Sequence, residues 1–421
     1  MHLSPQSQAS IRAALDSITS SSTTTGIPGL VFACVSKHGS LFSHASGMTG
    51  LSRPKSMTLD TTFWLASCTK LITTIACMQL VEQSKLSLDD AAQVERLCPE
   101  LAQKKVLSQN EGELVLAEKK DKITLRMLLT HTAGFGYSFL NETPRDWGRP
   151  VGVDEFSGEA GDVLGLPLVR ESGEAWEEGR VSGLKLNNYF QRHIFTPLGI
   201  DHISMFPGAE MRSNMASMLQ RDGAGKVTER DHLYRRPLRA ETDEERDGIF
   251  NSGGAGCFGA VRDYCQILST LLNNGISPTT QQPLLRSTSI TEILTNQIPD
   301  RPNFGRRNIA AAKPELTNAF EELLPQEGDP PQGFGLSCML TNLSAGSPED
   351  EKAQRRGRKD VKGSKGRNVA SWAGLANQFW WLDVERGVAG MLAAQVLPFG
   401  DEVVMGVYES VERGVYDGLE D

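Results

Sequence analysis

Hydrophobic and polar positions follow two different periods in the first part of the chain. Residues 6–18 form a polar segment with helical spacing, whereas residues 30–35 form a short apolar run of the kind found in buried strands. Residues 37–40 are typical of a tight turn, and residues 41–46 predict the returning strand. The chain is therefore expected to begin with a helix followed by a β-hairpin.

The middle of the chain has the pattern of a helical region. Apolar residues recur at helical spacing through residues 67–85, which predicts an amphipathic helix. Further helices are expected at residues 124–131, 186–195 and 260–273. Residues 345–368 are rich in charge and poor in apolar side chains, which predicts a solvated, flexible loop.

The end of the chain returns to strand-like patterns. β-branched and aromatic runs predict strands before a last helix, with the strands at residues 377–383, 388–394 and 403–409 and the helix at 411–419. Strands at both ends of a helical middle indicate an α/β (α+β) fold. We expect residues 1–60 and 330–421 to form the sheet domain, and residues 61–329 to form a mostly helical domain inserted into it.

Composition narrows the class of protein. The 421 residues carry 43 Lys and Arg against 52 Asp and Glu, a net charge of −9, which argues against nucleic-acid binding. No apolar window reaches the length of a membrane span, and the first residues lack the basic and apolar regions of a secretory signal. The seven cysteines are odd in number and lack CxxC spacing, which favours reduced thiols and no metal site. A soluble, cytoplasmic, globular protein is expected.

The candidate chemistry lies in an S-x-x-K sequence, residues 67–70. Positions i and i+3 share one helical face, so the Lys70 amine can approach the Ser67 hydroxyl, while Cys68 faces away. Serine becomes a good nucleophile when a neighbouring base takes its proton, and a desolvated lysine can be such a base. The N–H groups at the start of the helix would also stabilise developing negative charge.

Other segments place this pair in a known context. They are L-L-T-H-T-A-G at residues 128–134, I-F-T-P-L-G at 194–199, S-G-G-A-G at 252–256 and S-W-A-G-L at 371–375, followed by Trp380-Trp381. Together they resemble the serine β-lactamase and penicillin-binding-protein superfamily in its class C and esterase branch. The chain is most similar to fungal transesterases of the lovastatin-synthesis type, from about residue 6 to residue 416.

The resemblance implies a β-lactamase/transpeptidase-like fold, with an antiparallel sheet flanked by terminal helices. It implies that Ser67 and Lys70 are catalytic and that the N–H groups of Ser67 and Leu375 form the oxyanion hole. Trp372 and Gly374 would line the acyl pocket, whereas His131 would be structural. Because Trp372 stands where β-lactamases usually carry a lysine, β-lactam hydrolysis is disfavoured.

The resemblance also implies the type of reaction and its partners. An acyl group would pass from a small-molecule ester or thioester to an alcohol acceptor or to water, without a metal or organic cofactor. The donor would be carried by coenzyme A or by the acyl-carrier domain of a polyketide synthase, in secondary metabolism.

One motif of the branch is interrupted. Its proton-relaying tyrosine is expected between residues 172 and 184, where Glu178 stands in its place and roughly a dozen residues are missing. None of the six tyrosines (137, 189, 234, 264, 408 and 416) lies in an equivalent motif. Tyr189 fits core packing, and Tyr137 and Tyr234 are candidates for the pocket wall.

Three explanations of the interruption stay open. The chain is a non-catalytic paralogue, its gene model skipped coding sequence, or Glu178 or Lys70 alone relays the proton. Loss of a helix predicts weakened folding and low activity, because a domain is stable by only about 5–15 kcal/mol. The alternative function is a pseudoenzyme that binds a ligand or partner without turnover.

Overall fold

A seven-stranded antiparallel sheet built from both ends of the chain organises the fold. The computed structural model describes residues 1–20, 26–52, 54–110, 112–169, 184–303, 308–321, 331–343 and 363–420. Across the sheet the strands follow the order β11 (Gly333–Phe334), β12 (Met339–Thr341), β13 (Val369–Gly374), β14 (Gln378–Asp383), β15 (Val388–Ala393), β2 (Gly29–Ser36) and β3 (Gly39–Gly47). The N-terminal hairpin β2–β3 thus completes a sheet whose other strands come from the end of the chain, and the expected α/β class is confirmed.

Strand β2 is apolar from Leu30 to Val35 because both of its faces are covered. Val31, Ala33 and Val35 pack into one core, whereas Phe32 and Cys34 pack into the core on the opposite face. Side chains of successive strand residues point to opposite faces, so a strand that is buried on both sides is apolar along a continuous run instead of at alternate positions. This explains the continuous run that predicted the strand.

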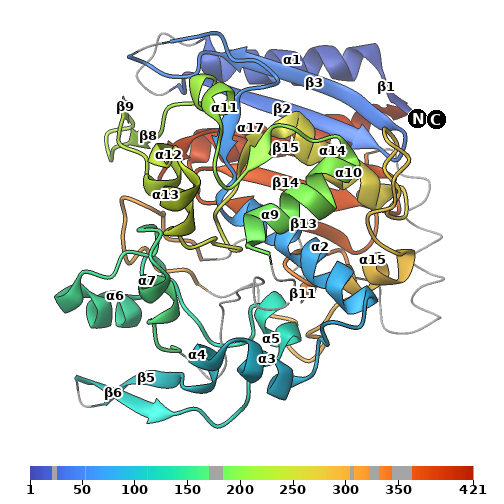
Figure 1. The fold of residues 1–421 in the computed structure, drawn as a ribbon. Helices are drawn as coiled ribbons and strands as arrows, with labels where there is room; N and C mark the ends of the chain where they lie inside the picture. Colours follow the sequence, from blue (N-terminus) through green and yellow to red (C-terminus); the bar gives the residue numbers. More distant parts are fainter. Residues whose placement is uncertain are drawn as a thin grey trace.

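The two terminal helices cover one face of the sheet (Figure 1). Helix α1 (Pro5–Thr19) begins after Ser4, whose hydroxyl accepts a hydrogen bond from the Ser7 N–H, and α17 (Glu402–Gly418) packs beside α1. The chain ends lie side by side in Figure 1, where β1 (His2–Leu3) pairs with β17 (Leu419–Glu420). The predicted helix at residues 6–18 is confirmed.

The predicted strand at residues 403–409 is wrong, because these residues form the first half of α17. Val404, Val407, Val411 and Val415 are all buried, and their spacing follows one face of a helix. The carboxylate of Asp401 accepts hydrogen bonds from the N–H groups at the start of this helix, which fixes where it begins. β-branched composition suggested a strand, but the spacing of the buried valines and this cap determine a helix.

Two helices from the middle of the chain cover the other face. Helix α14 (Val261–Leu272) packs on β15 and β2, and the Ser269 hydroxyl donates a hydrogen bond to the Ser36 carbonyl at the end of β2. Helix α2 (Thr69–Glu82) joins the same core. The expected amphipathic character of α2 is wrong: nearly all of its residues are buried, because the sheet side and the surrounding helices enclose it.

The remaining helices come from the middle of the chain. They are α3 (Ala91–Leu97), α4 (Pro99–Ala102), α5 (Leu125–Leu129), α6 (Glu142–Gly148), α7 (Ala160–Leu164), α9 (Leu186–Phe190), α10 (Thr196–Leu198), α11 (Ala209–Ser213), α12 (Arg236–Arg239), α13 (Asp243–Asp247) and α15 (Ser287–Ile293). Of these, α9 and α15 contact α2. Short helical turns lie at η1 (Ala66–Cys68), η2 (Arg149–Val151) and η3 (Gln191–Phe195). Helices α5, α9 and α14 therefore confirm the helices predicted in the middle of the chain.

Three small sheets complete the structure. They are β4 (Thr62–Trp64) with β10 (Phe258–Ala260) and β7 (Ile203–Ser204); β16 (Val396–Leu397) with β8 (Leu219–Arg221) and β9 (Val227–Glu229); and the hairpin β5 (Lys105–Asn110) with β6 (Glu113–Glu118). The hairpin β5–β6 projects from the lower left of the molecule in Figure 1. Among the described residues, no helix has the length and apolar character needed to cross a bilayer.

Candidate active site

The candidate nucleophile stands on a tight turn between β4 and α2. Leu65 follows β4, and its N–H donates a hydrogen bond to the Cys257 carbonyl (2.9 Å). Ala66 then adopts a left-handed conformation with φ of 43°, which costs a residue other than glycine roughly 1 kcal/mol. The turn η1 continues into α2, where the Thr69 hydroxyl accepts the Cys257 N–H (3.0 Å). Ser67 therefore lies on a strained turn that is hydrogen-bonded to Cys257 on both sides, at Leu65 and at Thr69.

Lys70 is the centre of the polar contacts around Ser67. Its side chain is buried, and Nζ donates to Ser67 Oγ (3.1 Å), to the Tyr137 hydroxyl (2.9 Å) and to the Gly254 carbonyl (2.9 Å). A charged lysine can donate a hydrogen bond to each of these three oxygens. A neutral lysine can donate two hydrogen bonds and accept one through its lone pair, so the arrangement suits a lysine that exchanges a proton with a hydroxyl. The helical spacing of the S-x-x-K sequence brings Ser67 and Lys70 together as predicted.

Tyr137, expected only as a candidate for the pocket wall, is a direct hydrogen-bond partner of Lys70. Tyr137 lies in the loop after α5, and its ring stacks on Phe139 with 4.8 Å between ring centres. Its hydroxyl reaches Lys70 from a segment outside the interrupted motif, and Glu178 falls outside the described residues. A signal was present in the sequence, since Tyr137 comes three residues after the L-L-T-H-T-A-G segment, but only the fold shows that this loop reaches Lys70.

The loop 252–256 closes the site beside Lys70 and Tyr137, since a Cβ atom on Gly254 would lie 3.4 Å from Lys70 Nζ and 3.9 Å from the Tyr137 hydroxyl. The Gly253 carbonyl accepts a hydrogen bond from the Thr73 hydroxyl (2.7 Å), next to the Lys70–Gly254 contact. The Ala255 carbonyl accepts the indole N–H of Trp64 on β4 (2.7 Å). The S-G-G-A-G segment is thus fixed to both the nucleophile-bearing helix and the strand before it.

Strand β13 runs close to the turn that bears Ser67. A Cβ atom on Gly374 would lie 2.6 Å from the Leu65 carbonyl oxygen and 2.4 Å from Gln378 Oε1, so a side chain here would push the strand away. Leu375 follows directly at the end of the strand and is almost fully buried. The candidate oxyanion residues, Ser67 and Leu375, therefore lie on two segments that pass close to each other.

The other predicted pocket residues differ in their surroundings. Trp372 is half-buried and packs edge-on against His131 and Phe334, with ring centres 5.1 and 5.4 Å away. His131 adopts a left-handed conformation after α5, consistent with a packing role. Tyr234 is buried, and its hydroxyl donates to the Phe250 carbonyl (3.0 Å), so it is directed at the main chain.

A cavity of about 150 Å³ opens beside Lys70 and Tyr137. Most of the described side chains that line it are apolar: Cys77, Leu125, Leu128, Leu129, Phe135, Phe156, Val163, Leu166, Phe250 and Ala255. Glu155 also lines the cavity, and burial raises the pKa of its carboxyl group. A predominantly apolar space beside Lys70, the hydrogen-bond partner of Ser67, suits the hydrocarbon part of an acyl group or of its acceptor.

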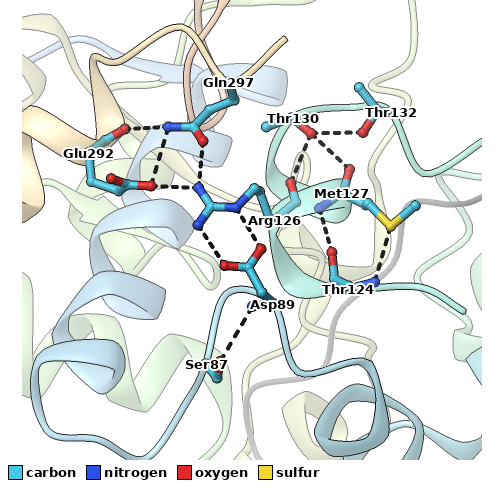
Figure 2. A network of polar contacts seen from close by, with 9 residues as sticks. All are labelled: Ser87, Asp89, Thr124, Arg126, Met127, Thr130, Thr132, Glu292 and Gln297. Carbon is cyan, nitrogen blue, oxygen red and sulfur yellow. Dashed lines mark hydrogen bonds and ion pairs between the residues drawn. The ribbon is translucent and has the colours of Figure 1, made fainter.

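Helix α5, whose leucines line this cavity, is fixed from outside by Arg126 (Figure 2). Both Asp89 carboxylate oxygens accept from the Arg126 guanidinium at 2.7 Å, and Glu292 and Gln297 accept from its Nη1. The paired Asp89 carboxylate raises the pKa of Arg126. A wider groove of about 580 Å³ lies here, but these charged groups already satisfy one another, so we place the chemistry at Ser67.

No group of three or more potential metal-binding side chains occurs within the described ranges. The polar groups that converge at the site are instead a serine, a lysine and a tyrosine hydroxyl. These are the components of nucleophilic acyl transfer.

Comparison with known proteins agrees with this site chemistry. The Beta-lactamase family matches residues 11–408. A monacolin J acid methylbutanoyltransferase of Aspergillus terreus is 28% identical over 378 residues, covering 85% of this chain and 82% of the relative. A lovastatin esterase of Penicillium rubens is 27% identical over 390 residues, covering 88% of each chain. A mutant simvastatin synthase of Aspergillus terreus superposes with a TM-score of 0.75 at 23% identity, covering 98% of each chain.

The fold and the site define a serine-type β-lactamase-like protein, and the family match extends over nearly the whole chain. The chain belongs to the Beta-lactamase family. Its named relatives include fungal acyltransferases and an esterase, and the similar solved structure has the same fold.

Proposed function

We propose that the protein is a serine acyltransferase or esterase that passes an acyl group from an ester or thioester to an alcohol or to water. The observation that carries the proposal is the position of Lys70 Nζ, within hydrogen-bond distance of both Ser67 Oγ and the Tyr137 hydroxyl. The relatives, which act in acyl transfer and ester hydrolysis by name, support the same chemistry. A place in polyketide-type secondary metabolism follows from the same relatives.

In acylation, Ser67 Oγ forms a bond to the acyl carbon while its proton moves to the neutral Lys70 amine. The oxyanion is stabilised by the N–H groups of Ser67 and Leu375, and Trp372 and Gly374 border the acyl pocket. The bond to the leaving group then breaks, and the leaving oxygen or sulfur takes a proton from the Lys70–Tyr137 pair. Tyr137 replaces, from another loop, the hydroxyl expected in the interrupted motif.

Deacylation repeats these steps in reverse. The acceptor alcohol or water gives its proton to the Lys70–Tyr137 pair and bonds to the acyl carbon. Ser67 then leaves and recovers a proton from Lys70. The apolar lining of the cavity favours acyl groups with a short hydrocarbon chain. Carrier-bound and coenzyme A thioesters are donors of the required chemistry.

Intact-protein mass spectrometry after incubation with p-nitrophenyl butyrate tests the proposal. The native chain should gain the mass of one butyryl group, and the Ser67→Ala variant should gain none. Adding an alcohol should shorten the lifetime of the adduct and yield the new ester. A folded chain that forms no adduct would contradict the proposal and would favour the pseudoenzyme that binds without turnover.

A further inference from the structure

The carboxylate of Glu155, a half-buried residue, lies against the loop that carries Tyr137. Its two oxygens accept from a single residue, Ser138: one from the main-chain N–H (2.8 Å) and the other from the hydroxyl (2.5 Å). Ser138 is 3% exposed. Among the described residues that line the cavity beside Lys70, Glu155 is the only acidic one. A carboxylate that loses part of its hydration needs hydrogen bonds in exchange, and Glu155 takes both of these from the buried Ser138, which indicates a specific role.

The next residue holds the other side of the same loop. Phe156 stacks near Phe139, with ring centres 6.0 Å apart, and Phe139 stacks on Tyr137. Phe156 is itself held edge-on by Trp64, on the strand that leads to the nucleophile. The pair Glu155-Phe156 therefore contacts the loop at Ser138 through its carboxylate and at Phe139 through its ring.

The hydrogen bond to the Ser138 N–H constrains Tyr137 directly. This N–H belongs to the same planar peptide unit as the Tyr137 carbonyl, so fixing its direction fixes the ψ angle of Tyr137. With the ring also stacked on Phe139, the hydroxyl has little freedom to move away from Lys70. Catalytic groups must be held within about 0.5 Å of their working positions, and neighbouring residues supply that restraint.

We infer that Glu155 is a positioning residue for acyl transfer, which keeps the Tyr137 hydroxyl on Lys70 by holding Ser138. The inference rests on the proposed function and adds a residue that lies outside every motif of the sequence. The hydrogen bonds of Glu155 described above go to Ser138, and not to Ser67 or Lys70, so Glu155 acts on the site through the loop.

A double-mutant cycle between Glu155 and Tyr137 tests this inference. Butyrate-ester hydrolysis is measured for Glu155→Ala, Tyr137→Phe and the double variant, with kcat and KM determined separately. Glu155→Ala should lower kcat about 10- to 100-fold with little change in KM, since a misplacement of about 1 Å costs roughly this much. In the Tyr137→Phe background the same change should lower kcat less than about twofold, because the hydroxyl it positions is already gone.

Two variants separate positioning from general damage. Glu155→Gln should keep most of the activity, since its amide can accept the Ser138 N–H and donate to the Ser138 hydroxyl. Glu159→Ala removes an exposed glutamate nearby that pairs with Arg236, and it should leave kcat unchanged. Thermal melts accompany each variant, and Glu155→Met replaces Glu155→Ala in the cycle should the latter not fold.

The outcomes distinguish the inference from the proposed function. If Glu155→Ala lowers kcat by the same factor in the Tyr137→Phe background as in the native background, the positioning role is overturned. Native activity in a folded Glu155→Ala variant would overturn it as well. Native kcat in Tyr137→Phe alone would instead refute the part given to Tyr137 in the proposed function, and would leave Glu155 nothing to position.

Discussion

The most informative single change is Tyr137→Phe, because it removes one oxygen atom and keeps the ring. The ring remains able to stack on Phe139, while Lys70 Nζ loses its hydrogen bond to the Tyr137 hydroxyl. Ser67 and Gly254 still accept from Lys70, so the lysine stays in place. The effect should therefore appear in the reaction rate and only weakly in the structure.

Its magnitude follows from the contact that is lost. A hydrogen bond to a charged partner contributes about 1.5–3 kcal/mol, and each 1.4 kcal/mol corresponds to about tenfold in rate. If the contact is strongest in the transition state, kcat falls by about 10- to 150-fold. A hydroxyl that also transfers the proton to the leaving group contributes roughly 10²- to 10⁴-fold. We expect a fall of about 100-fold.

The assay is the steady-state hydrolysis of a p-nitrophenyl ester together with a thermal melt. The matched control is Tyr416→Phe, which removes another buried hydroxyl from a titratable partner, Asp383 (3.0 Å), far from the site on α17. The control should lower the melting temperature and leave kcat of the folded protein unchanged. Equal kcat values for Tyr137→Phe and the native chain would refute the reasoning, as would equal losses in both variants.

Three further predictions concern strand placement, pH and a buried ion pair. Gly374→Ala should lower kcat at least about tenfold, since its Cβ would lie 2.6 Å from the Leu65 carbonyl; unchanged ester hydrolysis would contradict this. Burial lowers the pKa of His232 to about 4. As the pH falls from about 6.5 to 4, the unfolded chain binds a proton that the folded chain excludes, so the free energy of unfolding should fall by up to about 3 kcal/mol. Urea unfolding of His232→Asn across this range should lack that component, and a curve parallel to the native one would exclude it. Asp401→Ala should destabilise the fold by about 3–5 kcal/mol, because it removes the carboxylate that pairs with the largely buried Arg221 and uncaps α17; a melt within about 2 °C of the native one would show that the pair contributes little.

Periodicity was sufficient to predict the elements whose burial has a simple pattern. The hairpin β2–β3, the helix α14 and the strands β14 and β15 lie where the pattern placed them. Helix α2 shows the limit of this approach. Its burial on all sides depends on the layers around it, and these layers are formed by distant parts of the chain.

The candidate site divides in the same way. Ser67 and Lys70 are three residues apart, so helical geometry alone brings them together. Tyr137 is 67 residues from Lys70 and Gly254 is 184 residues from it, so their contacts depend on how complete segments pack. The interrupted motif drew attention to Glu178, whereas the hydroxyl beside Lys70 comes from a loop that no family motif marks.

The strand order of the central sheet has a consequence for the order of folding. Strand β2 pairs with β15, about 350 residues later in the chain, and β13 reaches the Ser67 turn only from the same late segment. During synthesis one apolar edge of the N-terminal hairpin therefore stays uncovered until almost the entire chain has left the ribosome. The late strand that closes this edge also completes the oxyanion side of the site. Ester hydrolysis should thus be the last property recovered on refolding, after the slow phase of tryptophan fluorescence. Nascent chains that end before β13 should form no acyl-enzyme.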